Sequence, residues 1–404
     1  MNFKLAFNDF IQLAERYFDA PTIEFIKVVG KRAVDSSGCR EWCQTIFEMR
    51  DFCKGTEPVP NSSFISHLDI DQGNPGRIPE LLFWQLFGVL AKPGVCMQLP
   101  VFNLPQSMVL GGLGVLCVKQ SNPSTICTQL DWRGDTPILK SQQEILQTEW
   151  IRHLSLVGPG LNCVIPLENR ALTAAKLQDF PIVSTRGFSE QWGSAVLDAA
   201  IVIKEYSEQA SHITERFVKN VLALICGDEA IGSASRQEAL GLIFLPAVLD
   251  RCDQLVECLL HEAMHQYLFR LEACARLFDQ TSPSEEVFYS PWRRDKRPLR
   301  MTLHGSFVFA AVADFYLWVA KNPQWGLDHS VSQMRVYQRY RESSIALDVV
   351  RKYGVMSKIG DKVLDALEAD LADIRGRIDL RTDRAAEVDQ SINDHLNEYD
   401  KNLH

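Results

Sequence analysis

Two apolar segments with helical periodicity constrain the fold of this chain more than any other feature. Apolar side chains recur on one side of a helix over residues 255–271, and again over residues 299–320. Each helix must bury its apolar side against another element, because an exposed stripe of that length is unfavourable in water. Together with a few short β-type runs, the two segments predict a mostly α protein with a small β component, which is an α+β fold.

The first segment contains an HExxH motif, formed by His261, Glu262 and His265. Two histidines four residues apart on a helix present both imidazoles on one face, at a spacing that suits one metal ion. His304 lies on the second segment, and a third ligand from a separate helix would leave coordination positions open. The pattern therefore predicts a catalytic metal site between two packed helices.

The composition excludes several classes of protein. A net charge of -9 and a pI near 5.6 argue against nucleic-acid binding as a main activity. The longest apolar run, 307–320, contains Asp314 and is too short for a membrane span. The 11 cysteines are odd in number and scattered, so they favour a reducing, cytoplasmic location over a disulfide framework.

The pattern along the chain suggests three regions. Residues 1–150 are expected to be mainly helical and to serve in substrate or leader-peptide recognition. Residues 151–345 form the expected metal-binding catalytic domain with the HExxH helix. Residues 346–404 carry an apolar seam of three/four spacing amid dense charge, which predicts a charged helical arm that could support a homodimer.

Shorter segments refine this division. Residues 138–160 suggest a helix that ends at a Gly-Pro-Gly sequence. Three β-type runs follow, at 163–166, 181–184 and 239–246.

The third metal ligand distinguishes between kinds of HExxH protein. The metzincin extension is absent, because positions 268 and 271, which would need glycine and histidine, are both leucine. A glutamate ligand would have to come from Glu272, which is close to His265 on the same helix, or from Glu285 or Glu286 in an expected loop. His304 is better placed than any of these, because it lies on a separate helix.

The segment YSPWRRDKRPLRMTLHG, at 289–305, completes a recognisable combination with the HExxH helix. Over residues 239–315 the chain resembles the HExxH-type, 2-oxoglutarate-dependent peptide β-hydroxylases, enzymes associated with modifying ribosomally made peptides. The resemblance implies that His261, His265 and His304 bind Fe(II). It also implies that arginines in and just after the Pro-Trp-Arg sequence, Arg293 and Arg297, hold the cosubstrate.

The chemistry of such an oxygenase is consistent with these residues. A keto acid would occupy two open positions on the ferrous ion and O2 a third, and an arginine matches the distal carboxylate of 2-oxoglutarate. Arg300 is a geometric rival for that role, since it lies one turn before His304 on the expected helix. Three imidazoles depart from the usual pattern of two histidines and a carboxylate, which leaves Glu262 to orient a ligand or water or to transfer a proton.

The expected function is therefore Fe(II)- and 2-oxoglutarate-dependent hydroxylation of a β-carbon in a peptide, such as a precursor peptide, without nucleic-acid or membrane partners. The main alternative is a zinc metallopeptidase in which Glu262 is the general base. A third hypothesis is a binding protein for peptides or partner helices, with the C-terminal helices as its interaction surface.

Overall fold

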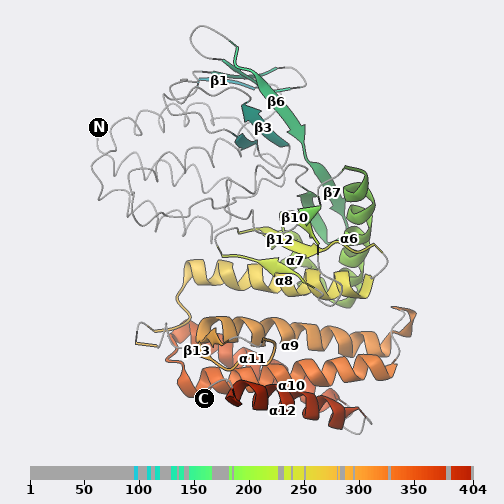
Figure 1. The fold of residues 1–404 in the computed structure, drawn as a ribbon, viewed down its shortest axis with the longest axis vertical. Coiled ribbons are helices and arrows are strands. Elements are labelled where there is room, and N and C mark those ends of the chain that lie inside the picture. Colours follow the sequence, from blue (N-terminus) through green and yellow to red (C-terminus); the bar gives the residue numbers. More distant parts are fainter. Residues whose placement is uncertain are drawn as a thin grey trace. The chain divides into compact units, whose positions relative to one another are not determined.

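The chain forms two compact units in the computed structural model (Figure 1). Unit 1 comprises Met1–Asp198 and Glu215–Asp250, and unit 2 comprises Ala199–Thr214 and Arg251–His404. The structure describes the following residues: 95–98, 107–110, 114–118, 129–133, 136–140, 145–165, 182–183, 186–225, 232–237, 240–249, 252–279, 281–282, 287–293, 296–325, 329–378 and 384–401. Most of these residues are helical and the others include several strands, so the α+β class is as predicted.

The main sheet of unit 1 has a parallel centre. Its strand order is β11-β12-β10-β8-β7, with β9 paired to β10, and β10 runs parallel to both β8 and β12. Strands β10 and β12 are buried at every position, as expected for apolar runs inside a parallel sheet. The strands are β7 (Leu154–Gly158), β8 (Leu161–Ile165), β9 (Ile182–Val183), β10 (Asn220–Leu224), β11 (Ala234–Ser235) and β12 (Leu242–Pro246). Of these, β8, β9 and β12 confirm the three β-type runs predicted from the sequence.

The predicted helix at 138–160 is wrong. Those residues form β5 (Ile138–Lys140), β6 (Thr148–Arg152) and β7, and the Gly-Pro-Gly sequence is the turn between β7 and β8. Gly160 adopts a φ of 76°, which favours glycine and lets the chain reverse in two residues. Strands override the local helical pattern here because β7 gains hydrogen bonds from β8, a partner outside the predicted helix.

Two further sheets of unit 1 occupy part of the predicted N-terminal helical region. They have the orders β1-β4-β5 and β2-β3-β6 and are antiparallel throughout. Their other strands are β1 (Val95–Gln98), β2 (Ser107–Leu110), β3 (Gly114–Val118) and β4 (Gln129–Trp132). The described residues up to 150 are thus strands rather than helices, and residues 1–94 lie outside the described part of the chain.

His153, between β6 and β7, makes the stability of unit 1 dependent on pH. Neither ring nitrogen has a hydrogen-bond partner among the described residues, and burial lowers the pKa of His153 to about 4. The unfolded chain binds a proton near pH 6.5 where the folded chain does not, so stability falls between about pH 6.5 and 4 and then levels off.

Between pH 7.5 and pH 5, we expect the free energy of unfolding to fall by about 2 kcal/mol more in the wild type than in the His153→Leu variant. Urea unfolding followed by tryptophan fluorescence measures this, because Trp132 on β4 and Trp150 on β6 belong to the same unit as His153. Parallel pH profiles for the two proteins would contradict the assignment.

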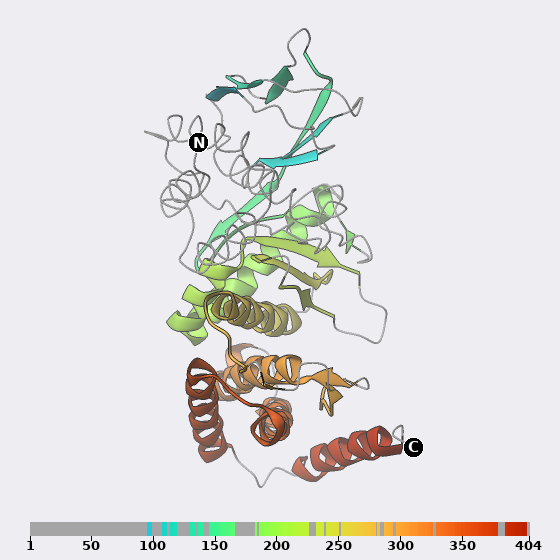
Figure 2. The same cartoon turned by 90° about the vertical axis from the view of Figure 1, so that its left-hand side faces the viewer.

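Unit 2 is a helical assembly built around α9 (Leu299–Lys321), which packs against α8 (Cys252–Cys274), α10 (His329–Tyr353) and α11 (Lys358–Arg377) (Figures 1 and 2). α12 (Ala385–Lys401) packs on α10. The remaining elements are the hairpin of β13 (Val287–Phe288) and β14 (Arg297–Pro298) and the short helix η2 (Pro323–Trp325). α8 and α9 confirm both helices predicted from the apolar segments.

Two helices, α6 (Arg186–Tyr206) and α7 (Glu208–Phe217), contain two of the three boundaries between the units; the third lies between Asp250 and Arg251. Within unit 1, Trp192 on α6 is fully buried and its indole N–H donates to the carbonyl oxygen of Pro246 at 2.9 Å. Within unit 2, the Tyr206 hydroxyl donates to Asp314 on α9 at 2.6 Å.

The C-terminal helices belong to the same unit as the HExxH helix, which differs from the separate region predicted for 346–404. The apolar seam of α11 is buried through Leu364, Leu367, Leu371 and Ile374. Ser357 caps α11 by accepting a hydrogen bond from the Gly360 N–H at 3.0 Å, and its own N–H bonds to Leu277 after α8. The seam therefore closes the core of unit 2, and a homodimer through these helices stays a prediction.

α9 is the one helix of the described residues that is long and apolar enough to cross a membrane. In its most apolar window, 72% of the helix is buried inside the protein. Fifteen residues of α9 are buried, including Ala313 and Phe315 on either side of Asp314, the charged residue in the apolar run. These properties are those of a core helix.

Candidate metal centre

Helices α8 and α9 bring the three predicted histidines together. His261 and His265 are one turn apart on α8, and their Nε2 atoms lie 3.1 Å apart. His304 is on α9, where its Nδ1 lies 3.1 Å from Nδ1 of His265. The histidine of α9 is fully buried, whereas the two on α8 are partly exposed.

The three rings form a chain rather than a convergent set of lone pairs. His265 faces His261 through Nε2 and His304 through Nδ1, so its two nitrogens are directed to different neighbours. In the part of the chain that the structure describes, no group of three or more metal-ligating side chains is arranged to hold an ion. Binding by all three histidines would therefore require a change in ring orientation.

Glu272 and Arg300 extend this chain at the end formed by His304. Glu272 lies on α8 and its Oε2 is 3.1 Å from Nε2 of His304. Arg300, one turn before His304 on α9, donates from Nε to Oε1 of Glu272 at 2.8 Å and from Nη2 to Oε2. The guanidinium thus forms a bidentate ion pair with the carboxylate, which is the strongest geometry for such a pair.

The carboxylate determines the proton positions along the chain. Burial opposes ionisation of Glu272, but hydrogen bonds from His304 and Arg300 outweigh burial and lower its pKa. The ionised carboxylate accepts the Nε2–H of His304, which leaves the Nδ1 lone pair to accept from Nδ1–H of His265. The free Nε2 of His265 then accepts from Nε2–H of His261, so one proton lies in each N···N contact.

All three imidazoles are neutral at pH 7. Burial lowers the pKa of His261 to about 4 and takes that of His265 well below its ordinary value. Burial also lowers the pKa of His304, although Glu272 partly offsets this. Neutral imidazoles keep the lone pairs that a metal ion needs.

The donor set fits a transition-metal ion in its chemistry. The Nε2 atoms of His261 and His265, 3.1 Å apart, would match neighbouring positions around an ion bound at about 2.1 Å once the proton of His261 moves to Nδ1. A metal-bound histidine commonly donates its other N–H to a carboxylate, and Glu272 provides that acceptor for His304. His261, His265 and His304 are therefore the residues that would hold the ion.

Glu262 is buried next to this chain. Its side chain is 2% exposed, and Oε1 lies 3.9 Å from Nε2 of His261. That separation is too long for a hydrogen bond but leaves the carboxylate beside the outer end of the imidazole chain. The position suits a group that orients or deprotonates a small molecule bound near His261.

The three predicted arginines occupy different environments. Arg300 serves as the partner of Glu272, so its fork is already occupied by a carboxylate. Arg297 is half-buried on β14, and Arg293 is exposed in the turn that follows Ser290. Of these three arginines, Arg300 is the one that the structure connects to the row of histidines, through Glu272.

Sequence reasoning missed a second polar cluster beside the histidines. Arg339 of α10 donates to Glu257 at 2.8 Å and to Glu342 at 3.0 Å. Glu257 also accepts from the Tyr316 hydroxyl at 2.5 Å. Glu257 lies one turn before His261, a spacing visible in the sequence, but nothing in the sequence connects it with Arg339.

Phe309 joins this cluster to the histidines. Its ring lies 4.7 Å from that of His261 and 5.0 Å from that of Trp292, and the Arg339 guanidinium lies 4.4 Å above it. Trp292 comes from the 289–293 segment, and this segment packs on α9 where Gly305 has no side chain. A Cβ atom at Gly305 would lie 2.3 Å from Trp292, so the tryptophan and the glycine fit each other.

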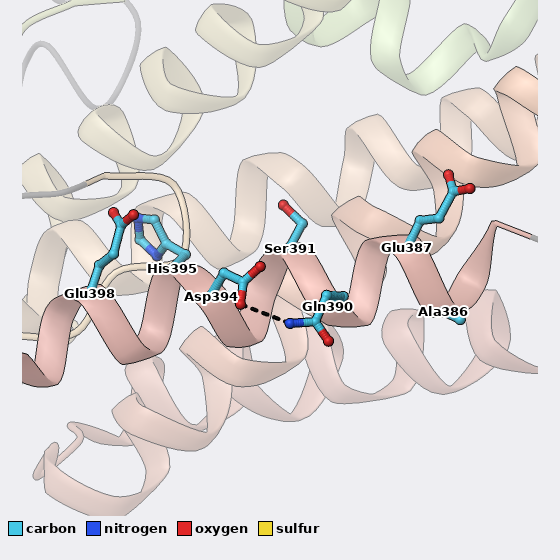
Figure 3. A pocket seen from close by; sticks show the side chains of 7 residues that line it. All are labelled: Ala386, Glu387, Gln390, Ser391, Asp394, His395 and Glu398. Atoms are coloured by element: carbon cyan, nitrogen blue, oxygen red, sulfur yellow. Dashed lines mark hydrogen bonds between the residues drawn. The ribbon is translucent and has the colours of Figure 1, made fainter.

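A cavity of about 620 Å³ opens beside Phe309, and we call it the α12 cavity. It is lined by Pro291, Trp292, Phe309, Met334, Gln338, Arg339, Glu342, Glu387, Val388, Ser391, Ile392 and His395. A second hollow of about 680 Å³ follows the surface of α12 itself (Figure 3). The two share Glu387, Ser391 and His395, so they adjoin along one side of α12.

The Glu272→Gln variant tests the carboxylate that holds His304. Loss of the negative charge frees the His304 ring and removes the partner of Arg300, so we expect metal affinity to fall by about 10–100-fold. Competition with a chelator measures the affinity. Glu368→Gln is the matched control, because Glu368 also binds an arginine, Arg351, but does so on the exposed surface of α11. Equal affinity in both folded variants would contradict this role for Glu272.

No protein-family model matches the chain, and no curated protein sequence matches it. The assignment of function therefore depends on the site itself and on the resemblance described above.

Proposed function

We propose that this protein is a cytoplasmic Fe(II)- and 2-oxoglutarate-dependent oxygenase that hydroxylates a β-carbon of a residue in a ribosomally made peptide. The observation that carries the proposal is the juxtaposition of three neutral histidines from two helices, with His304 held by the Glu272–Arg300 pair. A second observation supports the resemblance. Trp292, in the Pro-Trp-Arg sequence at 291–293, lies against Gly305, in the Leu-His-Gly sequence at 303–305.

Under this proposal, His261, His265 and His304 hold the ferrous ion, which with 2-oxoglutarate and O2 supplies the oxidising power for C–H hydroxylation. Glu272 and Arg300 fix the orientation and the tautomer of His304. Arg300 is therefore assigned to positioning, and Arg293 and Arg297 remain the arginines proposed for the distal carboxylate of 2-oxoglutarate. Glu262 orients a water molecule or a ligand beside His261.

The alternative is a zinc metallopeptidase with Glu262 as the general base. The observation in its favour is the position of the Glu262 carboxylate, which is buried 3.9 Å from the nitrogen of His261. In such an enzyme the glutamate takes a proton from the water that attacks the peptide bond.

Anaerobic reconstitution with Fe(II), followed by addition of 2-oxoglutarate, separates the two functions. We expect a weak visible absorption band from charge transfer between the metal and the chelating keto acid. No band, together with tight retention of zinc and cleavage of a generic peptide, would replace the oxygenase by the peptidase. Zinc cannot take part in oxygen activation, because it has no redox chemistry.

A further inference from the structure

We propose that the α12 cavity binds a positively charged side chain, that of a lysine or an arginine, in a peptide. That this peptide is the substrate rests on the proposed function. In that case the substrate has a basic residue close to the residue that is hydroxylated. The cavity adjoins the histidines through Phe309, whose ring contacts both His261 and Trp292.

The walls of the cavity suit the apolar stem of a basic side chain. Trp292 and Phe309 are stacked at 20° with their ring centres 5.0 Å apart, and aliphatic side chains of α10 and α12 complete the lining. A volume of about 620 Å³ is within the ordinary range for a small-ligand site and exceeds the size of one side chain. Lysine and arginine bury their methylene stems against such surfaces, and aromatic rings attract their charged ends.

The charges around the cavity select a cation. Among the described residues that line the cavity, Arg339 is the one arginine or lysine, and it already donates to Glu257 and Glu342. Glu342 and the exposed Glu387 give the lining two carboxylates against this one guanidinium, and Glu257, outside the lining, also accepts from Arg339.

Neighbouring charges reduce this excess of carboxylates without removing it. Arg384 adds one positive charge, because its Nη1 lies 3.9 Å from Sδ of the lining residue Met334. Arg335 approaches Asp253 at 3.6 Å, and Arg341 donates to Asp389 at 2.9 Å, so each brings a carboxylate with it. A basic side chain would restore the balance. An anion such as 2-oxoglutarate would have to displace Glu257 or Glu342 from Arg339 before it could pair there.

A peptide also brings backbone carbonyls, and the lining residue Trp292 carries an N–H donor. Among the described residues, the buried indole N–H of Trp292 has no hydrogen-bond acceptor. The indole N–H groups of Trp132, Trp150 and Trp325 are unpartnered in the same way, so for Trp292 a ligand carbonyl is one of several ways to satisfy the donor.

The test uses the full-length, metal-free protein and dye-labelled nonapeptides of glycine and serine with arginine, lysine, glutamine or glutamate at the centre. Fluorescence anisotropy should show the arginine and lysine peptides binding about tenfold more tightly than the glutamine peptide, and the glutamate peptide most weakly. Because no iron is present, failure here overturns the cavity proposal without touching the proposed reaction. Absence of the keto-acid absorption band would overturn the proposed reaction and leave the cavity proposal standing.

Charge reversal provides the matched variants. Glu387→Lys alters an exposed residue of the cavity rim and should abolish the preference for basic peptides. Asp348→Lys makes the same change on the exposed side of α10, outside the cavity, and should preserve that preference. Equal binding of all four peptides would overturn the proposal, as would an equal effect of the two substitutions. Tighter binding of the glutamate peptide would show that the cavity takes anions instead.

Discussion

The His304→Ala variant is expected to lose ferrous-ion binding and, with it, the absorption band given by 2-oxoglutarate. His304 is the sole histidine that α9 brings to the two on α8, and its removal also leaves the partly buried Glu272–Arg300 pair without its third member. The loss of affinity should exceed the roughly 10–100-fold expected when only a supporting carboxylate is removed. Chelator competition and the anaerobic absorption scan measure the two effects.

The control for this experiment is His212→Ala, which removes an exposed histidine of unit 2 from α7. It should bind iron as the wild type does. If the His304→Ala variant is folded and retains full affinity, His304 is not a ligand and the third donor must be sought elsewhere. A glutamate is then the next candidate, as in the peptidase hypothesis.

The Gly305→Ala variant is expected to be destabilised by about 2–3 kcal/mol, which lowers the melting temperature of unit 2 by about 5–10 °C. Alanine ordinarily favours a helix interior over glycine by about 1 kcal/mol. Here the sign reverses, because the new Cβ would lie 2.3 Å from Trp292, whose ring is held against Phe309. Thermal unfolding followed by circular dichroism measures the change.

Two further variants test that explanation. Gly376→Ala, on α11, adds a Cβ with no other atom within 4 Å and should stabilise the protein slightly. Combining Gly305→Ala with Trp292→Ala removes the atoms that clash, so the double variant should be no less stable than Trp292→Ala alone. A double variant that loses the sum of both single effects would show that the cost arises elsewhere.

The two helices of the site could be predicted from the sequence because their signals are local. The apolar spacing over 255–271 and 299–320 defines α8 and α9, and the four-residue spacing of His261 and His265 places both rings on one face. Strands β10 and β12 differ in this respect. The apolar run of β12 was recognisable, whereas its pairing with β10 is a contact between distant residues.

Residues 138–160 show the limit of local patterns. Their helical periodicity is real, but the hydrogen bonds that β6 and β7 form with β3 and β8 decide their conformation. The C-terminal seam was likewise visible as a helix. Its burial in unit 2 depends on contacts of α11 with α9 and α10 that no local spacing specifies.

The sequence by itself determined which histidines can meet and on which helices they lie. The tertiary structure alone decided what surrounds them: Arg300 binds Glu272 rather than remaining available for a keto acid, and Arg339 comes from a later helix to pair with Glu257. The reason is physical. Helical periodicity acts over neighbouring turns, whereas the partner of a buried charge is set by how whole helices pack, and burial requires that some partner be found.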